Sequence, residues 1–593
     1  MLFSALVDAD FLETEAHFNA KNGQKQYRQR APDLNPSDAL DILAAYVNKV
    51  AAETEASDVV KEVRAQLASD CLAAGEKPPG LFTLTAPTGS GKTLAMMVFA
   101  LKHALCHNLR RIVYVIPYLS IIEQTVHVYR KVFEKAMGPD YVLEHHSLAG
   151  TRGQDDGREG DCESARLAAE NWDAPIVITT SVQFLESLFS NRPSACRKLH
   201  RLARSVILFD EVQTIPLYLA IPTLAALSHL VERYRSTVVF ATATQPAFTH
   251  LHESVKKWCA SGWQPTEIVQ HKSAMFNKLR RNKVDWPELD ARLGWPELAE
   301  ILAKDTNRRV LCVVNLKRHA LELYRLVRDK LGEDNNLFHL STNMCPAHRK
   351  DVLRAIRNLL GDRGRPPCRL ISTQCVEAGV DVDFPVVYRA FGPLDSIAQA
   401  AGRCNRNGVV PDKGRLVVFL PEDEKYPQGP YEQAAGVART LATEKPDIDD
   451  PELFQKYYHR LYNITQPEER AAALTEAITN RDFAETCRHY KLIEKGAVNL
   501  LVPYDPEIFL SLLAEVRGGY GLTSRWVQKA RPYAVSIYRP GDDAPYVRIS
   551  PDDHPEIPDD WYAVAWNRNE EVIDYYHPKE GLIHRTTERH WIA

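Results

Sequence analysis

The sequence contains no long apolar run, no cysteine pair at metal-ligand spacing and no excess of positive charge. Its most apolar stretch, residues 217–230, is too short to cross a bilayer and contains Pro222 and His229, so we expect a buried helix and no membrane partner. The 11 cysteines include no CxxC pair, which argues against a disulfide framework or a zinc site and fits a reducing cytoplasm. With a formal net charge of −4, nucleic acid would have to bind in a local groove.

The N-terminal segment also lacks the features of an export signal. Its first Lys or Arg is Lys21, and Asp8 and Asp10 interrupt the apolar residues. The apolar positions recur at helical spacing, which predicts an amphipathic helix whose apolar face needs a core to lie against. These positions are Leu2, Phe3, Leu6, Val7, Ala9 and Phe11.

Short β-rich runs alternate with helical segments over much of the chain, a pattern typical of parallel α/β sheets. The first series comprises residues 81–87, 110–117, 174–180, 204–212 and 236–244, and the second comprises 308–316, 336–341, 368–374, 383–392 and 414–421. The chain has 593 residues, 45% of them hydrophobic and 25% charged, which suits several globular domains. We expect two tandem α/β domains and a smaller C-terminal unit rich in Tyr, Trp and Pro.

A glycine-rich turn lies between the first predicted strand and a predicted helix. Glycines let backbone N–H groups face an anion at a helix N-terminus, a lysine can reach the β and γ phosphates, and a threonine can supply an oxygen to Mg²⁺. The turn therefore predicts a nucleotide-phosphate site formed by Thr88, Gly89, Ser90, Gly91, Lys92 and Thr93.

Two adjacent carboxylates, Asp210 and Glu211, follow an apolar run. Ligands bind at the carboxyl ends of strands in open α/β sheets, so Asp210 can hold Mg²⁺ and Glu211 can orient the attacking water. Taken alone, the pair could equally be a plain acidic strand end. The phosphate-binding turn in the same domain favours the functional interpretation.

A third polar group lies in the second domain, at residues 396–408. Gln399, Gly402, Arg403 and Arg406 have helical spacings of three and four, so one helical face could present the glutamine and both guanidinium groups. Arginine suits a developing phosphoryl charge because it stays protonated and binds two oxygens. We expect arginine fingers that act across an interdomain cleft.

These segments and several others resemble, in order, the motifs of superfamily 2 helicases over roughly residues 60 to 420. The matching segments read "APTGSGKT", "VIPYLSIIEQ", "VITTSVQFLE", "DEVQ", "ATATQP", "HLSTNMCPAHR", "STQCVEAGVDVDF" and "QAAGRCNR". Their wording resembles the helicase-nuclease of type I CRISPR systems, which a target-bound Cascade complex recruits to unwind and degrade DNA. Ala86, where the general phosphate-loop pattern has Gly, is a departure that superfamily 2 helicases share.

The resemblance implies two RecA-like domains that close on ATP and Mg²⁺ and move 3′-to-5′ along single-stranded DNA. It assigns the coupling of the ATP cycle to this movement to Thr242 and Thr244. It places Gly379 and Asp381 near the nucleotide. It assigns backbone contacts with DNA to Thr180, Gln183, Asn315, Thr342 and Thr373. His145 and His146 have no companion ligands at zinc-like spacing, so we assign them to the DNA side of the first domain.

The resemblance also bears on the N-terminal helix. In this family an HD-type nuclease domain precedes the helicase, and residues 4–15 resemble its final helix, with Asp10 at a metal-ligand position. The sequence contains no His-Asp dipeptide, which an HD site requires. We therefore expect the nuclease to be missing through truncation, an internal start or separate encoding, and a transition metal to bind only if that domain is supplied.

The expected boundaries follow from these assignments. They are a nuclease remnant at 1–30, a connecting helical segment at 31–75, RecA-like domain 1 at 76–250, a linker at 251–305, RecA-like domain 2 at 306–430, a linker at 431–480 and a C-terminal domain at 481–593.

We expect a cytoplasmic, ATP-dependent single-stranded DNA translocase and helicase of antiviral CRISPR interference, which does not cut DNA as an isolated chain. One alternative is an RNA helicase of the same superfamily, because the motifs do not reveal recognition of the 2′-hydroxyl. A second is a Cascade-docking module without useful ATP turnover, against which Lys92, Glu211, Arg403 and Arg406 weigh.

Overall fold

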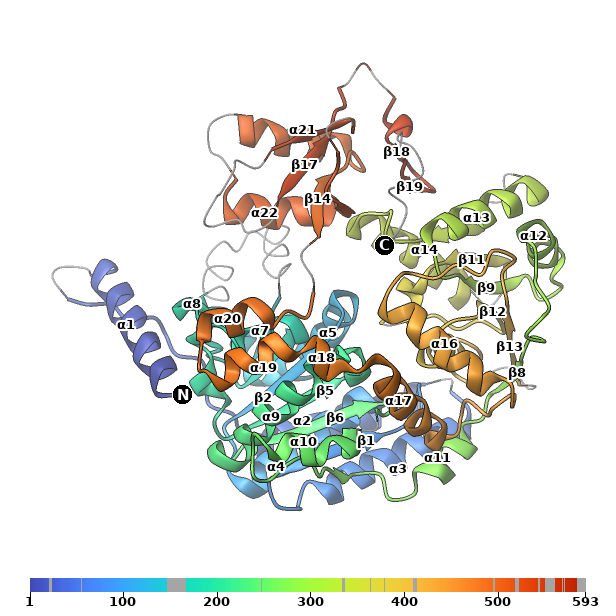
Figure 1. The fold of residues 1–593 in the computed structure, drawn as a ribbon. Helices are drawn as coiled ribbons and strands as arrows, with labels where there is room; N and C mark the ends of the chain where they lie inside the picture. Colours follow the sequence, from blue (N-terminus) through green and yellow to red (C-terminus); the bar gives the residue numbers. More distant parts are fainter. Residues whose placement is uncertain are drawn as a thin grey trace. The chain divides into compact units, whose positions relative to one another are not determined.

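Two parallel β-sheets form the centres of the two units into which the chain divides (Figure 1). Unit 1 comprises Met1–Arg280 and Ile448–Glu494, and unit 2 comprises Arg281–Asp447 and Lys495–Ala593. The structure is a computed structural model, and it describes all residues except 21–23, 55, 147–166, 247, 333–335, 363, 378, 409–412, 494–495, 518–521, 542–543, 550–559, 568, 570 and 584–593.

The sheet of unit 1 has seven parallel strands in the order β3-β4-β2-β5-β6-β1-β7. The strands are β1 (Leu81–Thr85), β2 (Arg111–Ile116), β3 (Val142–His145), β4 (Ile176–Thr180), β5 (Ser205–Asp210), β6 (Thr237–Thr242) and β7 (Thr266–Glu267). The five predicted strands are confirmed. The two additional ones, β3 and β7, are short edge strands without a long β-rich run.

Alternate residues of these strands enter two separate hydrophobic cores, as the period of two in a strand requires. Tyr114 and Leu208 belong to one core, and Val113 and Phe209 belong to the other. The first core also contains residues of α2 (Pro36–Glu53), α3 (Asp58–Ala74), α4 (Lys92–His107), α5 (Leu119–Met137) and α11 (Lys272–Lys278). The second contains residues of α7 (Ser181–Leu188), α9 (Ala220–Tyr234), α10 (His252–Lys256) and α19 (Ala472–Thr479).

The segment 448–494 returns to unit 1, although part of it was expected to be a linker. It forms α17 (Pro451–Thr465), α18 (Pro467–Arg470), α19 and α20 (Phe483–His489). Tyr490 is buried, stacks on Phe189 with ring centroids 3.8 Å apart, and its hydroxyl lies 2.6 Å from that of Thr223. The acidic and proline-containing segments led to the prediction of a linker. The apolar residues of α17 nevertheless recur at helical spacing between charged ones, and they are the residues that the helix buries.

The sheet of unit 2 has six parallel strands in the order β10-β11-β9-β12-β13-β8. They are β8 (Asn282–Asp285), β9 (Arg309–Val313), β10 (Leu337–Leu340), β11 (Cys368–Ser372), β12 (Val386–Ala390) and β13 (Gly414–Phe419). The associated helices are α12 (Trp295–Lys304), α13 (Lys317–Leu331), α14 (Pro346–Gly361), α15 (Leu394–Ala401) and α16 (Pro430–Ala442). The expected linker at 251–305 thus differs from the structure, since β7 joins the first sheet and β8 joins the second.

The C-terminal part of unit 2 is built on a four-stranded sheet in the order β15-β14-β17-β16. Its strands are β14 (Ala497–Leu501), β15 (Ala534–Tyr538), β16 (Tyr546–Arg548) and β17 (Trp561–Val564), with α21 (Pro506–Glu515) and α22 (Ser524–Ala530) beside them. Trp526 and Trp561 pack edge to face in its core. The hairpin β18 (Tyr576–His577) and β19 (Gly581–Leu582) follows, and Glu580 pairs with Arg325 and Arg328 of α13.

Candidate active site

The glycine-rich turn joins β1 to α4 as predicted. Gly89 and Gly91 have φ values of +81° and +83°, a left-handed conformation that favours glycine, and Gly91 directly precedes the first residue of α4. The Lys92 ammonium donates a hydrogen bond to the carbonyl of Ala86 at 3.2 Å. The Ser90 hydroxyl is buried and has no hydrogen-bond partner among the described residues, so a polar atom is left for a ligand at the start of the helix.

Arg64 of α3 also reaches this turn, which the sequence did not predict. Its guanidinium donates to the carbonyl of Gly89 at 3.1 Å, and its side-chain Cγ would lie 3.3 Å from a Cβ added at Gly91. The arginine therefore fixes the outer side of the turn. Nothing in the helical pattern of α3 distinguishes Arg64 from a solvent-exposed arginine.

Asp210 ends β5 as a buried carboxylate in the same unit. It accepts hydrogen bonds from the Tyr114 hydroxyl at 3.2 Å and from the Glu211 N–H at 3.0 Å. Burial, together with the adjacent Glu211, raises the pKa of Asp210 to about 6, and Lys92 acts in the opposite direction. A buried carboxylate between a lysine and a second carboxylate has the chemistry of a Mg²⁺ ligand.

A chain of side-chain hydrogen bonds links Glu211 to the end of β6. Glu211 has a left-handed φ of +50°, and its carboxylate accepts a bond from the Gln213 amide at 2.6 Å. The Gln213 oxygen accepts a bond from the Thr242 hydroxyl at 2.7 Å, and the Thr242 hydroxyl accepts one from the Thr244 N–H at 3.0 Å. The structure thus connects the predicted water-orienting and coupling residues through Gln213, to which sequence reasoning gave no role.

In unit 2, the predicted arginines do not share one helical face. Helix α15 ends at Ala401 and Gly402 caps it, so the helical spacing that the sequence suggested stops before Arg403. The Arg403 guanidinium is buried and donates to the carbonyls of Val376 at 3.1 Å and Glu377 at 2.5 Å. The expectation of two guanidinium groups presented by one helix is therefore corrected.

Of the remaining predicted nucleotide residues of unit 2, Asp381 contacts Arg406. Its guanidinium pairs with Asp381 at 3.2 Å, and its N–H donates to the Asp383 carboxylate at 2.7 Å. Gly379 has a left-handed φ of +72°, and Gln399 lies in the last turn of α15.

The predicted nucleic-acid residues differ in their exposure. In unit 1, Thr180 caps α7 by accepting the Gln183 N–H at 3.0 Å. In unit 2, Thr342 is exposed, whereas Asn315 and Thr373 are buried. The Asn315 amide donates to the carbonyl of Phe391 at 2.7 Å and its oxygen accepts from Arg389, so this side chain is part of the interior.

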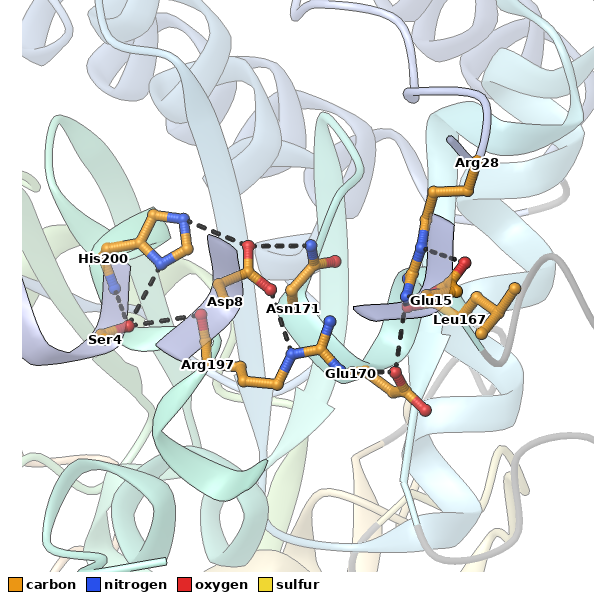
Figure 2. A network of polar contacts seen from close by, with 9 residues as sticks. All are labelled: Ser4, Asp8, Glu15, Arg28, Leu167, Glu170, Asn171, Arg197 and His200. Carbon is orange, nitrogen blue, oxygen red and sulfur yellow. Dashed lines mark hydrogen bonds and ion pairs between the residues drawn. The ribbon is translucent and has the colours of Figure 1, made fainter. Parts of the chain in front are cut away.

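The N-terminal helix α1 (Leu2–Phe18) packs on unit 1 through its polar side (Figure 2). The Asp8 carboxylate is buried and accepts bonds from Arg197 and Asn171, both at 3.1 Å, and His200 lies 3.7 Å away. The Ser4 hydroxyl accepts the His200 N–H at 2.9 Å. This differs from the expectation that the apolar face of the helix lies against a core, because the packed face is the polar one.

The apolar side of α1 faces away from these contacts. Leu2 is 90% exposed, Leu6 is 69% exposed, and Phe3 and Phe18 are also exposed. Asp10 is exposed as well, and in the part of the chain that the structure describes no three His, Cys, Asp or Glu side chains are placed to hold a metal ion.

The two adjacent histidines of unit 1 make hydrogen bonds to neighbouring side chains. His145 accepts a bond from Trp172 at 2.8 Å, and the ring of His146 lies 2.7 Å from the Glu144 carboxylate. Among the described residues, no helix is both long and apolar enough to traverse a bilayer.

Two family models match the chain in the regions of the two parallel sheets. Residues 61–251 match "DEAD/DEAH box helicase", and residues 306–409 match "CRISPR-associated nuclease/helicase Cas3, C-terminal". A "CRISPR-associated nuclease/helicase Cas3" of Haloferax volcanii is 27% identical over 455 residues, 59% of this chain and 48% of the relative. One of the same name from Methanothermobacter thermautotrophicus is 25% identical over 361 residues, 58% of this chain and 41% of the relative. The chain thus spans about half the length of the curated relatives it matches.

Solved structures show the same fold. A T. fusca Cas3-ATP crystal structure superimposes with a TM-score of 0.61 at 16% identity, covering 94% of this chain and 70% of the other. A chain of a "CRISPR RNA-guided surveillance complex, pre-nicking" superimposes with a TM-score of 0.56 at 17% identity, covering 88% and 70%.

Proposed function

The chain carries a helicase core of the CRISPR-associated Cas3 family, and on this premise we propose that it couples ATP hydrolysis to 3′-to-5′ movement along single-stranded DNA. The observation that carries the proposal is the connection of Glu211 through Gln213 to Thr242 at the strand ends where Lys92 and Asp210 lie. In this proposal, the Glu211 carboxylate is hydrogen-bonded through Gln213 to the end of β6, so a movement of β6 changes its contacts.

Each predicted site residue of unit 1 has one role in the proposed reaction. Lys92 and the N–H groups at the start of α4 would bind the β and γ phosphates, and Thr93 and Asp210 would hold a Mg²⁺ ion that neutralises part of their charge. The carboxylate of Glu211 orients a water molecule in line with the γ-phosphate. Arg403 and Arg406 of unit 2 stabilise the charge that develops as the bond to the γ-phosphate breaks.

The decisive experiment compares ATP hydrolysis without nucleic acid, with single-stranded DNA and with RNA of the same sequence. We expect DNA to stimulate turnover, RNA not to, and EDTA to abolish the activity. Unwinding of duplexes with a 3′ or a 5′ overhang then tests direction, and only the 3′ overhang should support it. Stimulation by RNA alone would favour the RNA helicase, and no turnover under any condition would favour a docking module.

We also propose that the chain acts on DNA held by a Cascade complex and that a nuclease domain covers the apolar side of α1. The names of the relatives include a nuclease activity, and one neighbour is a chain of a surveillance complex. The exposed Leu2, Phe3 and Leu6 supply apolar area, while the anchored Asp8 side holds the helix in place. Burying such side chains contributes about 1.5–3 kcal/mol each.

This part of the proposal has its own test. A Leu6→Asp variant should retain DNA-stimulated ATP hydrolysis but lose degradation of target DNA when the host's Cascade and nuclease domain are supplied. Degradation at the normal rate by Leu6→Asp would contradict the docking surface. Metal-dependent cutting by the purified chain alone, with Mn²⁺, Co²⁺ or Ni²⁺, would contradict the need for a supplied domain.

A further inference from the structure

A buried ion pair lies beside the turn that holds Arg403. Arg389 of β12 is fully buried and Glu377 is 4% exposed, and the Arg389 Nε and the Glu377 Oε1 are 2.8 Å apart. Among the described residues, neither of these two atoms has a hydrogen-bond partner of good geometry, so the contact between them is an ion pair and not a hydrogen bond. Each charge therefore depends on the other for compensation, because an unpaired buried charge is costly.

The same arginine binds two further elements of unit 2. Its Nη1 donates to the Asn315 side-chain oxygen at 2.8 Å, and its Nη2 donates to the Tyr431 hydroxyl of α16 at 2.8 Å. The Tyr431 hydroxyl in turn donates to Asn315 at 2.9 Å. A Cβ added at Gly392 would lie 2.9 Å from that hydroxyl, so the chain leaves space for the cluster at this position.

The turn at Glu377 connects this cluster to Arg403. The Arg403 guanidinium donates to the main-chain carbonyls of Val376 and Glu377, while the side chain of Glu377 contacts Arg389. One residue therefore fixes the backbone that orients the Arg403 guanidinium and is itself held by a buried charge. Gln374, at the start of the same turn, donates to the Asn315 carbonyl at 2.9 Å, so both ends of the turn are attached to the cluster.

We propose that Glu377 and Arg389 are positioning residues that set the orientation of Arg403 for ATP hydrolysis. This inference rests on the proposed function of Arg403. A neutral glutamine at position 377 keeps the size of the side chain but removes the attraction to Arg389, so the turn is no longer held and the two carbonyls shift. A small displacement of a group that acts on transition-state charge lowers turnover more than it weakens substrate binding.

The test is a double-mutant cycle with the full chain and single-stranded DNA. Arg403→Lys should lower kcat by at least about tenfold with a KM for ATP within about twofold, and Glu377→Gln should lower kcat by about tenfold in the same way. In the double variant, Glu377→Gln should add less than about twofold. Glu424→Gln is the matched control, because Glu424 pairs with Arg292 and Arg439 in the same unit, and it should leave kcat unchanged.

The outcomes separate the inference from the function on which it rests. Normal turnover by Arg403→Lys would overturn the arginine-finger function itself. Reduced turnover by Arg403→Lys with independent, multiplicative effects of the two substitutions would overturn only the positioning role. If Glu377→Gln does not fold, Tyr431→Phe removes one hydroxyl from the cluster, and its kcat should fall by a few-fold only when Arg403 is present. An equal fall in both backgrounds would again overturn the inference.

Discussion

The Thr242 hydroxyl donates a hydrogen bond to the side-chain oxygen of Gln213 at 2.7 Å, and the amide of Gln213 donates to Glu211 at 2.6 Å. Thr242 is the last residue of β6, which lies between β5 and β1 in the sheet. A displacement at the end of β6 would therefore alter the hydrogen bonds of the carboxylate proposed to orient water. We propose this connection as the physical basis for stimulation of hydrolysis by bound DNA.

Replacing Gln213 by Leu should uncouple hydrolysis from DNA. The leucine cannot bridge Thr242 and Glu211, so we expect DNA-stimulated kcat to fall by roughly tenfold, corresponding to one or two lost hydrogen bonds, with ATP affinity nearly unchanged. ATPase assays with and without single-stranded DNA measure this. Gln66→Leu, on the exposed side of α3, is the control and should behave like the unmodified chain.

Removing the Lys92 ammonium should abolish catalysis. Lys92→Ala loses the cation proposed to bind the β and γ phosphates, so turnover should fall on the order of 10³ and binding of a fluorescent ATP analogue should weaken. Lys102→Ala lies on the same helix α4, where Lys102 pairs with the exposed Glu76. It should retain full activity, and equal losses in both variants would indicate damage to the helix instead of loss of a phosphate ligand.

Two glycine substitutions should separate backbone strain from damage to the nucleotide site. Gly91 and Gly138 both have positive φ values, +83° and +95°. Alanine should cost about 1–2 kcal/mol of stability at Gly91, which is in the left-handed region, and about 1–3 kcal/mol at Gly138, whose ψ of 162° places it in an extended region that only glycine adopts readily. Only Gly91→Ala should also lose ATP binding, because its Cβ would press on Arg64 at the phosphate turn, whereas the position of Gly138 is open. Thermal unfolding with and without ATP and Mg²⁺ distinguishes the two effects.

Acid should destabilise unit 1 through the buried His103. Its ring nitrogens lie 3.0 Å from the Gly75 carbonyl and 2.8 Å from the Thr237 hydroxyl, and burial lowers its pKa to about 4. The unfolded chain binds a proton at higher pH than the folded chain does, so stability is present above about pH 6.5 and is lost as the pH falls toward 4. This contribution amounts to roughly 3 kcal/mol.

The measurement is urea unfolding at a series of pH values. His103→Gln should show a shallower decline in unfolding free energy between pH 6.5 and 4 than the unmodified chain does. His17→Gln, at an exposed position of α1, should leave the slope as it was. Identical slopes for all three proteins would show that His103 does not contribute.

Asp8 and Asp10 should respond differently to the same substitution. Asp8→Ala removes one of the two carboxylates that contact the buried Arg197, the other being that of Glu170, and should weaken the attachment of α1 by about 1–3 kcal/mol. Hydrogen exchange should then rise across residues 2–18. Asp10→Ala removes an exposed side chain and should leave exchange unchanged, and neither variant should alter ATP hydrolysis. Equal exchange in both variants would contradict the anchoring role of Asp8.

The sequence predicted the parts of the site that depend on short segments. Asp210 ends a β-rich run and Lys92 begins the helix that follows one, so the elements that carry them could be predicted from neighbouring residues. Arg64 and Tyr114 reach the same region from other elements, and no local pattern marks them.

The orientation of α1 was unpredictable for a related reason. Its periodicity correctly indicated a helix with an apolar face, but which face packs depends on partners far along the chain. Arg197 and Asn171 compensate the Asp8 carboxylate, and this compensation is visible only once the elements are assembled. Arg403 is a similar case, because helical spacing continued in the sequence past the residue where α15 ends.

Because residues 448–494 return to unit 1, the ribosome completes this unit only after it has synthesised the large sheet of unit 2. The six-stranded sheet of unit 2, residues 282–419, is synthesised before the last helices of unit 1, although unit 1 begins first. Until Tyr490 has emerged, Phe189 lacks its stacking partner. The nascent first unit therefore exposes the apolar ring of Phe189 while the six-stranded sheet of the second unit is synthesised, a period in which the chain is prone to aggregate.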